Sequence, residues 1–203
     1  MNKIVKEGKV LEEIIEAIKS ENNLADNEFL YTRKEQKGGL FKGTTLVVEA
    51  ISLQEIQDYL KKFLKELLAK MGLEVTFESM IREGQIIIKM YSNNNPILIG
   101  KNGQTLKALE TVCKQIIYNE IGTFPYLSLD VEDYKTKQLK RLERLAKNVA
   151  REVAKTKVET TLDSMNSYER RIVHNALTNF RGVYTESIGE EPNRCVVIKP
   201  KDN

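Results

Sequence analysis

The stretch ILIGKNGQTL, residues 97–106, decides how the rest of the chain is interpreted. Gly100 and Gly103 enclose Lys101 and Asn102, between an apolar run and a stretch with helical periodicity. Glycine adopts positive φ without strain and lets a ligand backbone approach the main chain. A helix N-terminus after such a loop favours an anion, and Lys101 adds a positive charge. The pattern predicts a loop that binds a phosphate backbone; a plain glycine-rich turn between two helices is the alternative.

The segments on both sides of this loop predict a small domain of helices and strands. Ser52 is a suitable N-cap for a helix, Glu55 follows three positions later, and Gly72 is a suitable end. The expected elements are a helix at 52–72, a hairpin at 73–91, a short helix before the loop, a helix reaching residue 120 and a strand at 125–131.

The N-terminal residues 1–51 predict a separate unit with the order β-α-β-β. Apolar residues at helical spacing precede two strand-like pieces, at 28–33 and 44–51. The glycine-rich connection between these pieces carries Leu40 and Phe41, which are candidates for docking to another protein. We favour the alternative that both side chains fold back onto the core, because a small domain needs its apolar groups there.

Residues 134–157 predict a helix with an unusual charge pattern. They hold nine Lys or Arg and two Glu, which is a local net charge of +7. At about 100° per residue, one side of this helix is apolar and includes Leu145, and the other side is basic. The basic stripe consists of Lys137, Lys140, Arg141, Arg144, Lys147, Arg151 and Lys155. A solvated surface normally mixes charges of both signs, so the pattern favours contact with successive phosphates over a plain solvated face.

A further helix, ending at Gly182, is predicted near the C-terminus. Arg170 and His174 are four residues apart and therefore lie on the same side of it, with Arg181 one further turn along. A guanidinium beside an imidazole is suited to recognising a phosphate or a base edge. The alternative is a surface arginine next to a half-buried structural histidine.

Composition excludes several classes of function. The net charge of +3 over 203 residues neither demands nor excludes a polyanionic partner. Cys113 and Cys195 are too far apart in the sequence for a metal-ligand pattern, so we expect buried free thiols, no metal site and no cofactor. No apolar run has the length of a membrane span, and no signal-peptide core is present. We therefore expect a cytoplasmic protein.

A metal-dependent nuclease is the enzymatic alternative. Asp130, Glu132 and Asp133 cluster at the end of a predicted strand, and the first two share one face of it. Three acids at a strand end are more often a solubilising edge or a helix cap, and no second carboxylate cluster accompanies them. We expect no catalytic residues.

Two sequence motifs add to these patterns. LIGKNGQTLKAL closely resembles a KH domain, whose Gly-x-x-Gly loop holds about four nucleotides by their backbone, and the element order over residues 52–133 is that of the type II KH arrangement. MNSYERRIVHNAL resembles the R-three-H domain, which is named for its Arg-x-x-x-His signature, and Arg170 and His174 match that signature. The whole chain resembles the bacterial Jag (KhpB) family of RNA-binding proteins, which are associated with the SpoIIIJ membrane insertase.

This resemblance implies an α+β fold of three small units in series. They are a Jag N-terminal-like unit at 1–51, a type II KH domain at 52–133, and the basic helix with an R-three-H domain at 134–203. The implied RNA-binding residues are Gly100, Lys101, Asn102, Gly103, Lys107, Arg170, Arg171 and His174.

The resemblance also implies a role and partners. We expect a regulator that binds single-stranded RNA, or else single-stranded DNA, and is linked to cell elongation, division or sporulation. A small KH-only protein or a second copy is an expected partner, and membrane association is expected only through a partner. A docking adaptor at the insertase is the alternative role. Two features depart from the family: Lys42 interrupts its Gly-Leu-Phe-Gly type repeat, and a long charged linker after the first domain is missing.

Overall fold

The computed structural model describes residues 1–36 and 45–201. They form two compact units, residues 1–132 and residues 133–203, and each unit is described by itself. Leu40 and Phe41 lie outside the described residues, so their predicted docking role stays a prediction. The predicted boundary between residues 51 and 52 falls inside the first unit, and the division into three domains likewise stays a prediction.

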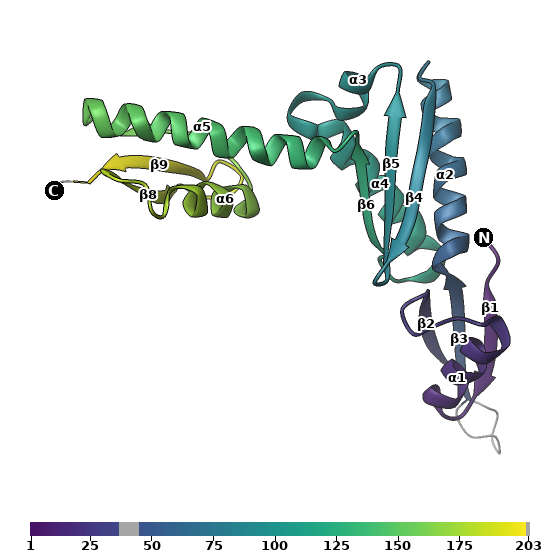
Figure 1. The fold of residues 1–203 in the computed structure, drawn as a ribbon. Coiled ribbons are helices and arrows are strands. Elements are labelled where there is room, and N and C mark those ends of the chain that lie inside the picture. The colour runs from purple at the N-terminus through teal and green to yellow at the C-terminus, as the bar shows by residue number, and fades with distance from the viewer. Residues whose placement is uncertain (37–44, 202–203) are drawn as a thin grey trace. The chain divides into compact units, whose positions relative to one another are not determined.

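The first unit begins with the predicted β-α-β-β order. Its elements are β1 (Ile4–Gly8), α1 (Leu11–Asn22), β2 (Phe29–Gln36) and β3 (Thr45–Ser52). The strands form an antiparallel sheet in the order β1-β3-β2, so that β2 lies at one edge (Figure 1). Ile14 and Ile18 of α1 pack against Phe29, Val48 and Ala50. This small apolar cluster fixes α1 on one face of the sheet.

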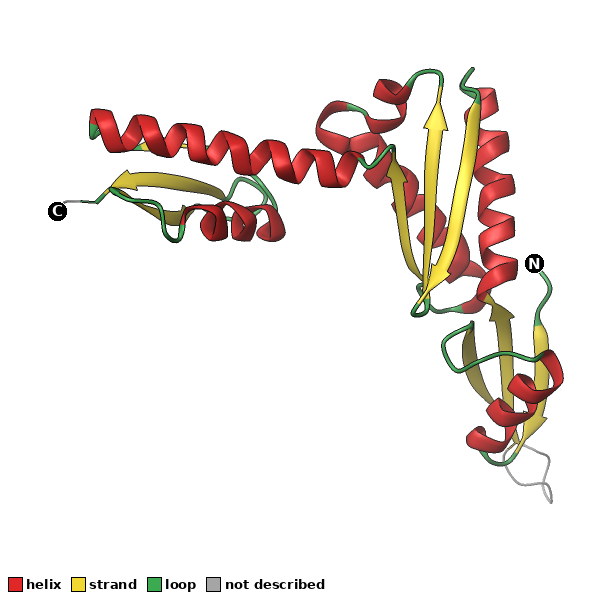
Figure 2. Ribbon diagram, viewed as in Figure 1, coloured by secondary structure: helices red, strands yellow, loops and turns green. Residues whose placement is uncertain are grey.

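The remainder of the first unit has the predicted order of helices and strands. Its elements are α2 (Leu53–Lys70), β4 (Val75–Arg82), β5 (Gln85–Ser92), α3 (Asn95–Ile99), a short 3-10 turn η1 (Lys101–Gly103), α4 (Gln104–Ile121) and β6 (Tyr126–Val131). The sheet order is β4-β5-β6, with β4 antiparallel and β6 parallel to β5 (Figure 2). Ser52 caps α2 as predicted, because its hydroxyl accepts a hydrogen bond from the Glu55 amide at 3.2 Å.

Local sequence explains the hairpin turn and the buried face of this sheet. Glu83 and Gly84 both have positive φ, as a two-residue hairpin turn requires, and the turn joins β4 to β5. On β5, Ile86, Ile88 and Met90 are fully buried. The matching buried residues of the helices are Leu60, Leu64 and Leu68 of α2 and Cys113 and Ile117 of α4. Burial raises the pKa of the Cys113 thiol to about 12, so this cysteine is an unreactive core residue.

The second unit consists of two helices and a small sheet. Its elements are α5 (Tyr134–Thr156), β7 (Thr160–Thr161), α6 (Ser167–Leu177), β8 (Val183–Ile188) and β9 (Cys195–Pro200). The antiparallel sheet has the order β7-β9-β8. The core joins both helices to the sheet through Ala146, Ala150, Val153, Val173, Leu177, Val183, Val196 and Ile198.

Two predictions for this unit were wrong. Leu145 is 49% exposed rather than buried, because at about 100° per residue it points roughly 100° away from the strip formed by Ala146, Ala150 and Val153. Helix α6 ends at Leu177 and not at Gly182, so Arg181 is not on the helix. Residues 178 and 179 are Thr and Asn, which are weak helix formers, and the chain turns there as the Phe180 amide donates to the Leu177 carbonyl at 2.9 Å.

Candidate nucleic-acid interface

Gly100 occupies a position that no other residue fits. Its φ is 70° and its ψ is −179°, a region that essentially only glycine adopts. A Cβ atom added to Gly100 would lie 2.2 Å from Thr105 Oγ1 and 2.9 Å from the Thr105 backbone nitrogen. Its amide donates to the Pro96 carbonyl at 2.8 Å and so ends α3. The first glycine of the loop is therefore required by backbone geometry and by close packing on α4.

The rest of the loop is a tight turn that leads directly into α4. Asn102 and Gly103 have φ of 52° and 77°, and the Gly103 amide donates to the Gly100 carbonyl at 3.3 Å. Gly103 is the N-cap of α4 and has no side chain that could cap the first amides of the helix. Those amides and the helix dipole favour an anion at this point.

The loop is held firmly at its base and is open at its tip. Leu98 before it and Leu106 after it are buried, with exposures of 0% and 3%. Lys101 and Asn102 are exposed, and Lys107 lies on the exposed side of the first turns of α4. The structure thus brings the predicted loop residues together as a tight turn that presents backbone amides and two lysines.

The basic stripe on α5 is exposed along its whole length. All seven of its residues are classed as exposed, and among the described residues none of them forms an ion pair with an acid. Arg151 donates to the side chain of Asn148 at 2.7 Å. From Lys137 to Lys155 the stripe runs about 27 Å at 1.5 Å per residue. These cations are available to an external polyanion.

The charge of the molecule is divided unequally between the two units. Residues 133–203 contain fifteen Lys and Arg against ten Asp and Glu, a net charge of +5. Residues 1–132 contain seventeen against nineteen, a net charge of −2. Long-range attraction for a polyanion therefore comes from the second unit, while the Gly100–Gly103 loop and its two lysines lie in a unit whose net charge is slightly negative.

The side chain of Arg170 points into the interior of the second unit. Only 7% of it is exposed. Its Nη1 atom donates to the Met165 carbonyl at 2.7 Å and lies 2.8 Å from Glu191 Oε1. Arg170 therefore joins the start of α6 to the loop between β8 and β9. Sequence spacing placed Arg170 and His174 on one side of a helix, but it gave no sign that this guanidinium has internal partners.

The N-terminus of α6 is fixed by further polar contacts. Asn166 and Glu169 form a reciprocal capping box, in which each side chain accepts a hydrogen bond of 3.0 Å from the other residue's amide. Gln138 of α5 donates to Glu169 at 3.2 Å. The Met165 amide also donates to the Arg194 carbonyl at 3.1 Å. These contacts fix the position of α6 and therefore also the position of its exposed residues.

His174 is half-buried and is held by β8. Its Nδ1 atom lies 2.6 Å from Thr185 Oγ1, which leaves Nε2 as the ring nitrogen for a ligand. Burial, and then the nearby Arg170 charge, lower the pKa of His174 below its ordinary value of 6.5. His174 is therefore neutral at pH 7, and at that pH it can serve as a hydrogen-bonding group but not as a cation.

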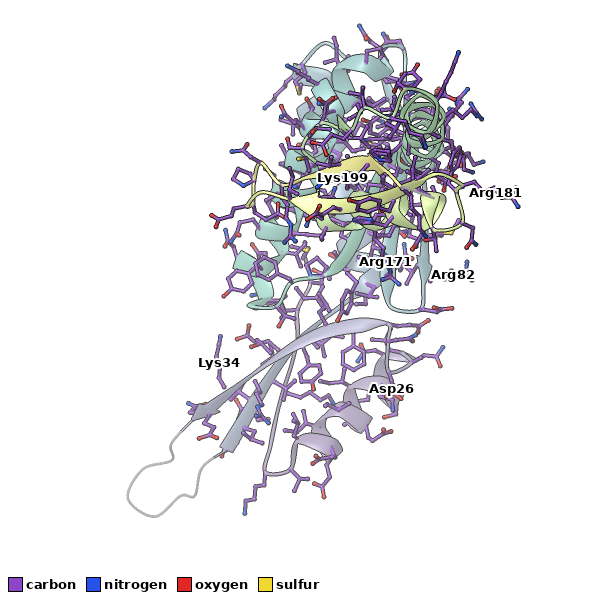
Figure 3. The ribbon with its side chains drawn as sticks, turned by 90° about the vertical axis from the view of Figure 1, so that its left-hand side faces the viewer. Asp26, Lys34, Arg82, Arg171, Arg181 and Lys199 are labelled. Atoms are coloured by element: carbon purple, nitrogen blue, oxygen red, sulfur yellow. The ribbon has the colours of Figure 1, made fainter. Side chains whose placement is uncertain are left out.

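The open side of α6 carries residues that the sequence patterns brought out only in part. Arg171, which is labelled in Figure 3, is exposed. Tyr168, which lies one turn before it, is 58% exposed and was not among the predicted residues. An aromatic ring beside an arginine is suited to stacking on a base. The spacing of three residues between Tyr168 and Arg171 in SYERR could have indicated this.

The predicted acids do not form a metal site in the part of the chain that the structure describes, where no group of three metal-ligating side chains is found. Asp130 accepts a hydrogen bond from the Val131 amide at 2.9 Å. Asp133 occupies the N-cap position of α5, although its side chain does not make a capping hydrogen bond. In residues 1–36 and 45–201, no helix is long and apolar enough to cross a membrane.

Comparisons with known proteins identify the domains in which these residues lie. Residues 57–122 match the family described as the KH domain of KhpA/KhpB, and residues 140–200 match the R-three-H domain family. The chain is 31% identical to the RNA-binding protein KhpB of Clostridium symbiosum over 206 residues, which cover 99% of this chain and 93% of the relative. It is 39% identical to the KhpB of Bacillus subtilis over 107 residues, about half of each chain. It is 33% identical to the KhpB of Lactiplantibacillus plantarum over 147 residues, which cover 44% of that relative.

Proposed function

We propose that this chain, which belongs to the KhpB family, binds single-stranded RNA through its Gly100–Gly103 loop and the basic face of its second unit. The relatives named above are RNA-binding proteins, and the two matched domains are binding domains without enzymatic chemistry. The observation that carries the proposal is the α5 stripe, which holds seven exposed cations without an acidic partner among the described residues.

The two regions would contribute differently to RNA binding. The Gly100–Gly103 loop would bind the phosphate backbone through amides and Lys101, at a place where the backbone conformation is already fixed. The α5 stripe would supply most of the electrostatic affinity, because each phosphate contact releases counterions. Lys107 extends the first region by one helical turn.

On α6 the signature residues would have separate tasks. Arg171 and the Nε2 atom of His174 would contact the RNA, and Tyr168 would stack on a base. Arg170 would act by position, because its guanidinium already binds Met165 and Glu191. This assignment changes the predicted role of Arg170 from direct contact to support.

The family resemblance suggests finer roles, which we add as part of the proposal. They are action in the cytoplasm as a post-transcriptional regulator linked to cell elongation, division or sporulation, and pairing with a small KH-only protein or with a second copy. Membrane association would occur only through a partner. Crosslinking the protein to RNA in cells and sequencing the fragments would identify the RNA targets.

A retention assay tests the proposed function. Labelled single-stranded RNA is incubated with the full chain and Mg²⁺, and the RNA is then examined for both retention and cleavage. We expect retention of intact RNA, and a parallel single-stranded DNA of the same sequence measures the preference between the two. Cleavage would indicate an enzyme, and neither retention nor cleavage would leave protein docking as the function.

A further inference from the structure

Strand β2 has one edge that pairs with no other described strand. In the sheet order β1-β3-β2, one side of β2 pairs with β3, and no described strand lies on the other side. The Tyr31 carbonyl accepts a hydrogen bond from Thr123 Oγ1 at 3.4 Å, so the backbone groups of Tyr31 point away from β3. In an antiparallel strand the amide and carbonyl of one residue point to the same side, and this side alternates. The backbone groups of Arg33 and Glu35 therefore face the open side as well.

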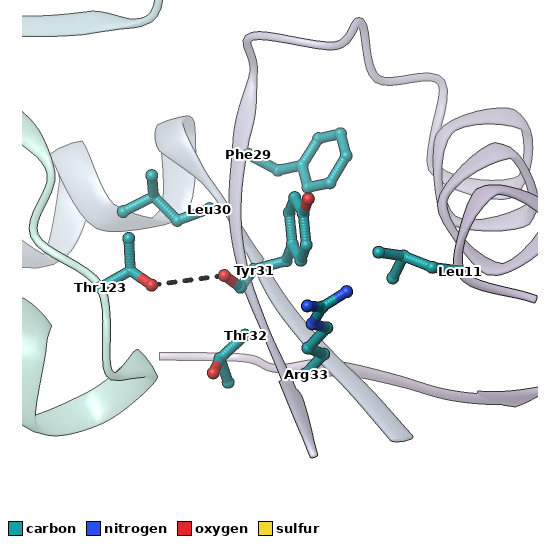
Figure 4. A pocket seen from close by; sticks show the side chains of 7 residues that line it. All are labelled: Leu11, Phe29, Leu30, Tyr31, Thr32, Arg33 and Thr123. Carbon is teal, nitrogen blue, oxygen red and sulfur yellow. Dashed lines mark hydrogen bonds between the residues drawn. The ribbon is translucent and has the colours of Figure 1, made fainter. Parts of the chain in front are cut away.

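A hollow runs along this edge. Its volume is about 470 Å³, and it is lined by Leu11 of α1, by residues 29–33 of β2 and by Thr123 (Figure 4). The side chains of Phe29, Tyr31 and Arg33 leave β2 on the side of α1, and Leu11 faces them (Figure 4). Tyr31 is 37% exposed, and its ring centroid lies 6.1 Å from that of Phe29. The hollow thus combines an apolar wall with a row of main-chain groups.

The positive charge of Arg33 at this edge has no acidic partner among the described residues. Arg33 is exposed and forms no ion pair with any acid of the described chain. Its neighbour Lys34 is different, because Lys34 lies on the other face of β2 and binds Glu49 at 2.8 Å. This contact lowers the pKa of Glu49 below its ordinary value. The unpaired cation is therefore the one that points into the hollow.

We infer that the free edge of β2 is a docking site for an extended acidic peptide of a partner protein, which adds to the sheet as a fourth strand. The Tyr31 carbonyl already accepts from Thr123, so the outward amides and carbonyls of Arg33 and Glu35 would bind the peptide main chain, as in other cases of strand addition. An apolar side chain of the peptide would lie against Tyr31 and Leu11, and a carboxylate would pair with Arg33. A charged edge discourages indiscriminate pairing, and so it selects a partner of opposite charge.

A peptide fits this edge better than RNA does. An RNA strand has no row of alternating amides and carbonyls with which to extend the ladder. The unit that contains β2 also has a net charge of −2, which repels a polyanion at long range but is no obstacle to a short peptide with one carboxylate at Arg33. This site shares no residue with the Gly100–Gly103 loop or with the α5 stripe.

The first test uses the full chain and altered peptides. An isotope-labelled protein is titrated with a short peptide of alternating valine and threonine that carries a single central glutamate, and backbone amide shifts are followed by NMR. We expect the largest shifts at Tyr31, Arg33 and Glu35. Two further peptides carry N-methyl groups on alternate residues, in opposite phase. One phase removes the amides that face β2 and should weaken binding about tenfold or more, and the other phase should leave it unchanged.

The second test reverses the charge. Arg33→Glu should weaken binding of the glutamate peptide about tenfold and should improve binding of a peptide with lysine in place of glutamate. Arg82→Glu makes the same change of charge on an exposed residue of the same unit, 74% of whose side chain is accessible, and should alter neither affinity. Circular dichroism of both variants verifies that they are folded.

Three results would overturn the inference. Equal binding of the two N-methylated peptides would show that no ladder forms. Self-association that Arg33→Glu abolishes, without peptide binding, would make the edge an interface between copies. Displacement of the peptide by single-stranded RNA, together with RNA-induced shifts at Tyr31 and Arg33, would assign the hollow to RNA.

Discussion

Replacing Gly100 by alanine should destabilise the first unit strongly. The φ of 70° and ψ of −179° at this position cost a non-glycine residue about 1 to 3 kcal/mol. The new Cβ would also lie 2.2 Å from Thr105 Oγ1 and 2.9 Å from the Thr105 backbone nitrogen. The hydroxyl can rotate away but the helix backbone cannot, and overpacking of this kind costs about 1 to 3 kcal/mol. We expect a total loss of about 2 to 6 kcal/mol.

Gly72→Ala is the matched control. Gly72 has a φ of 77°, but no atom lies within 4 Å of the position that its Cβ would take. The control therefore carries only the cost of a left-handed conformation, about 1 to 2 kcal/mol. Differential scanning calorimetry of the two full-length variants compares the costs directly. Gly100→Ala should lower Tm by at least about 2 to 4 °C more than Gly72→Ala.

A third variant separates the two parts of the cost. Adding Thr105→Ala to Gly100→Ala removes the hydroxyl contact but leaves the contact with the backbone nitrogen. Stability should therefore recover only in part. Equal Tm values for Gly100→Ala and Gly72→Ala would refute the packing argument. Full recovery in the double variant would show that the α4 backbone is not a constraint on the loop.

Three further predictions concern binding and pH. Lys101→Asp with Asn102→Asp should weaken RNA binding at least about tenfold with little change in Tm, because both side chains are exposed. A large drop in Tm alongside the lost binding would show that these residues stabilise the fold instead of contacting RNA. Arg144→Gln with Arg151→Gln should reduce the slope of log affinity against log salt by about 0.7 to 1.4. An unchanged slope would show that the stripe is a plain solvated surface that does not contact phosphates. Because burial and Arg170 lower the pKa of His174, the unfolded chain takes up a proton more readily, so stability should fall as pH drops below about 6.5. A His174→Gln variant should lack that part of the decline in thermal unfolding.

Local sequence signals were sufficient for much of the fold. The Ser52 cap, the Glu83–Gly84 turn and the glycines of the central loop each depend on chemistry within a few residues. Apolar periodicity then determined the type and order of the elements, because each helix or strand buries one face. The exposure of the α5 cations also followed from their angular separation from the apolar strip.

Contacts between distant residues could not be predicted in this way. Arg170 pairs with Glu191, which follows β8 in the sequence. Helical spacing does not indicate that the chain folds back after β8 and brings Glu191 next to α6. The open side of β2 is another example, because it depends on the strand order and on the position of Thr123. The pattern of β2 shows which residues share a face, but not which edge of the sheet it occupies.

The central claim is that one RNA strand binds both the Gly100–Gly103 loop and the second unit. In the second unit it would contact the α5 stripe and the exposed residues of α6. Its most direct test is the affinity of the full chain for single-stranded RNAs of increasing length at fixed salt. Two sites on one chain gain from effective concentration, so affinity should rise about 100-fold or more once the RNA reaches both. Arg171→Ala with His174→Ala should reduce that gain and spare the short RNA, while the α5 stripe keeps the remainder. A wild-type affinity that does not depend on RNA length would contradict the account.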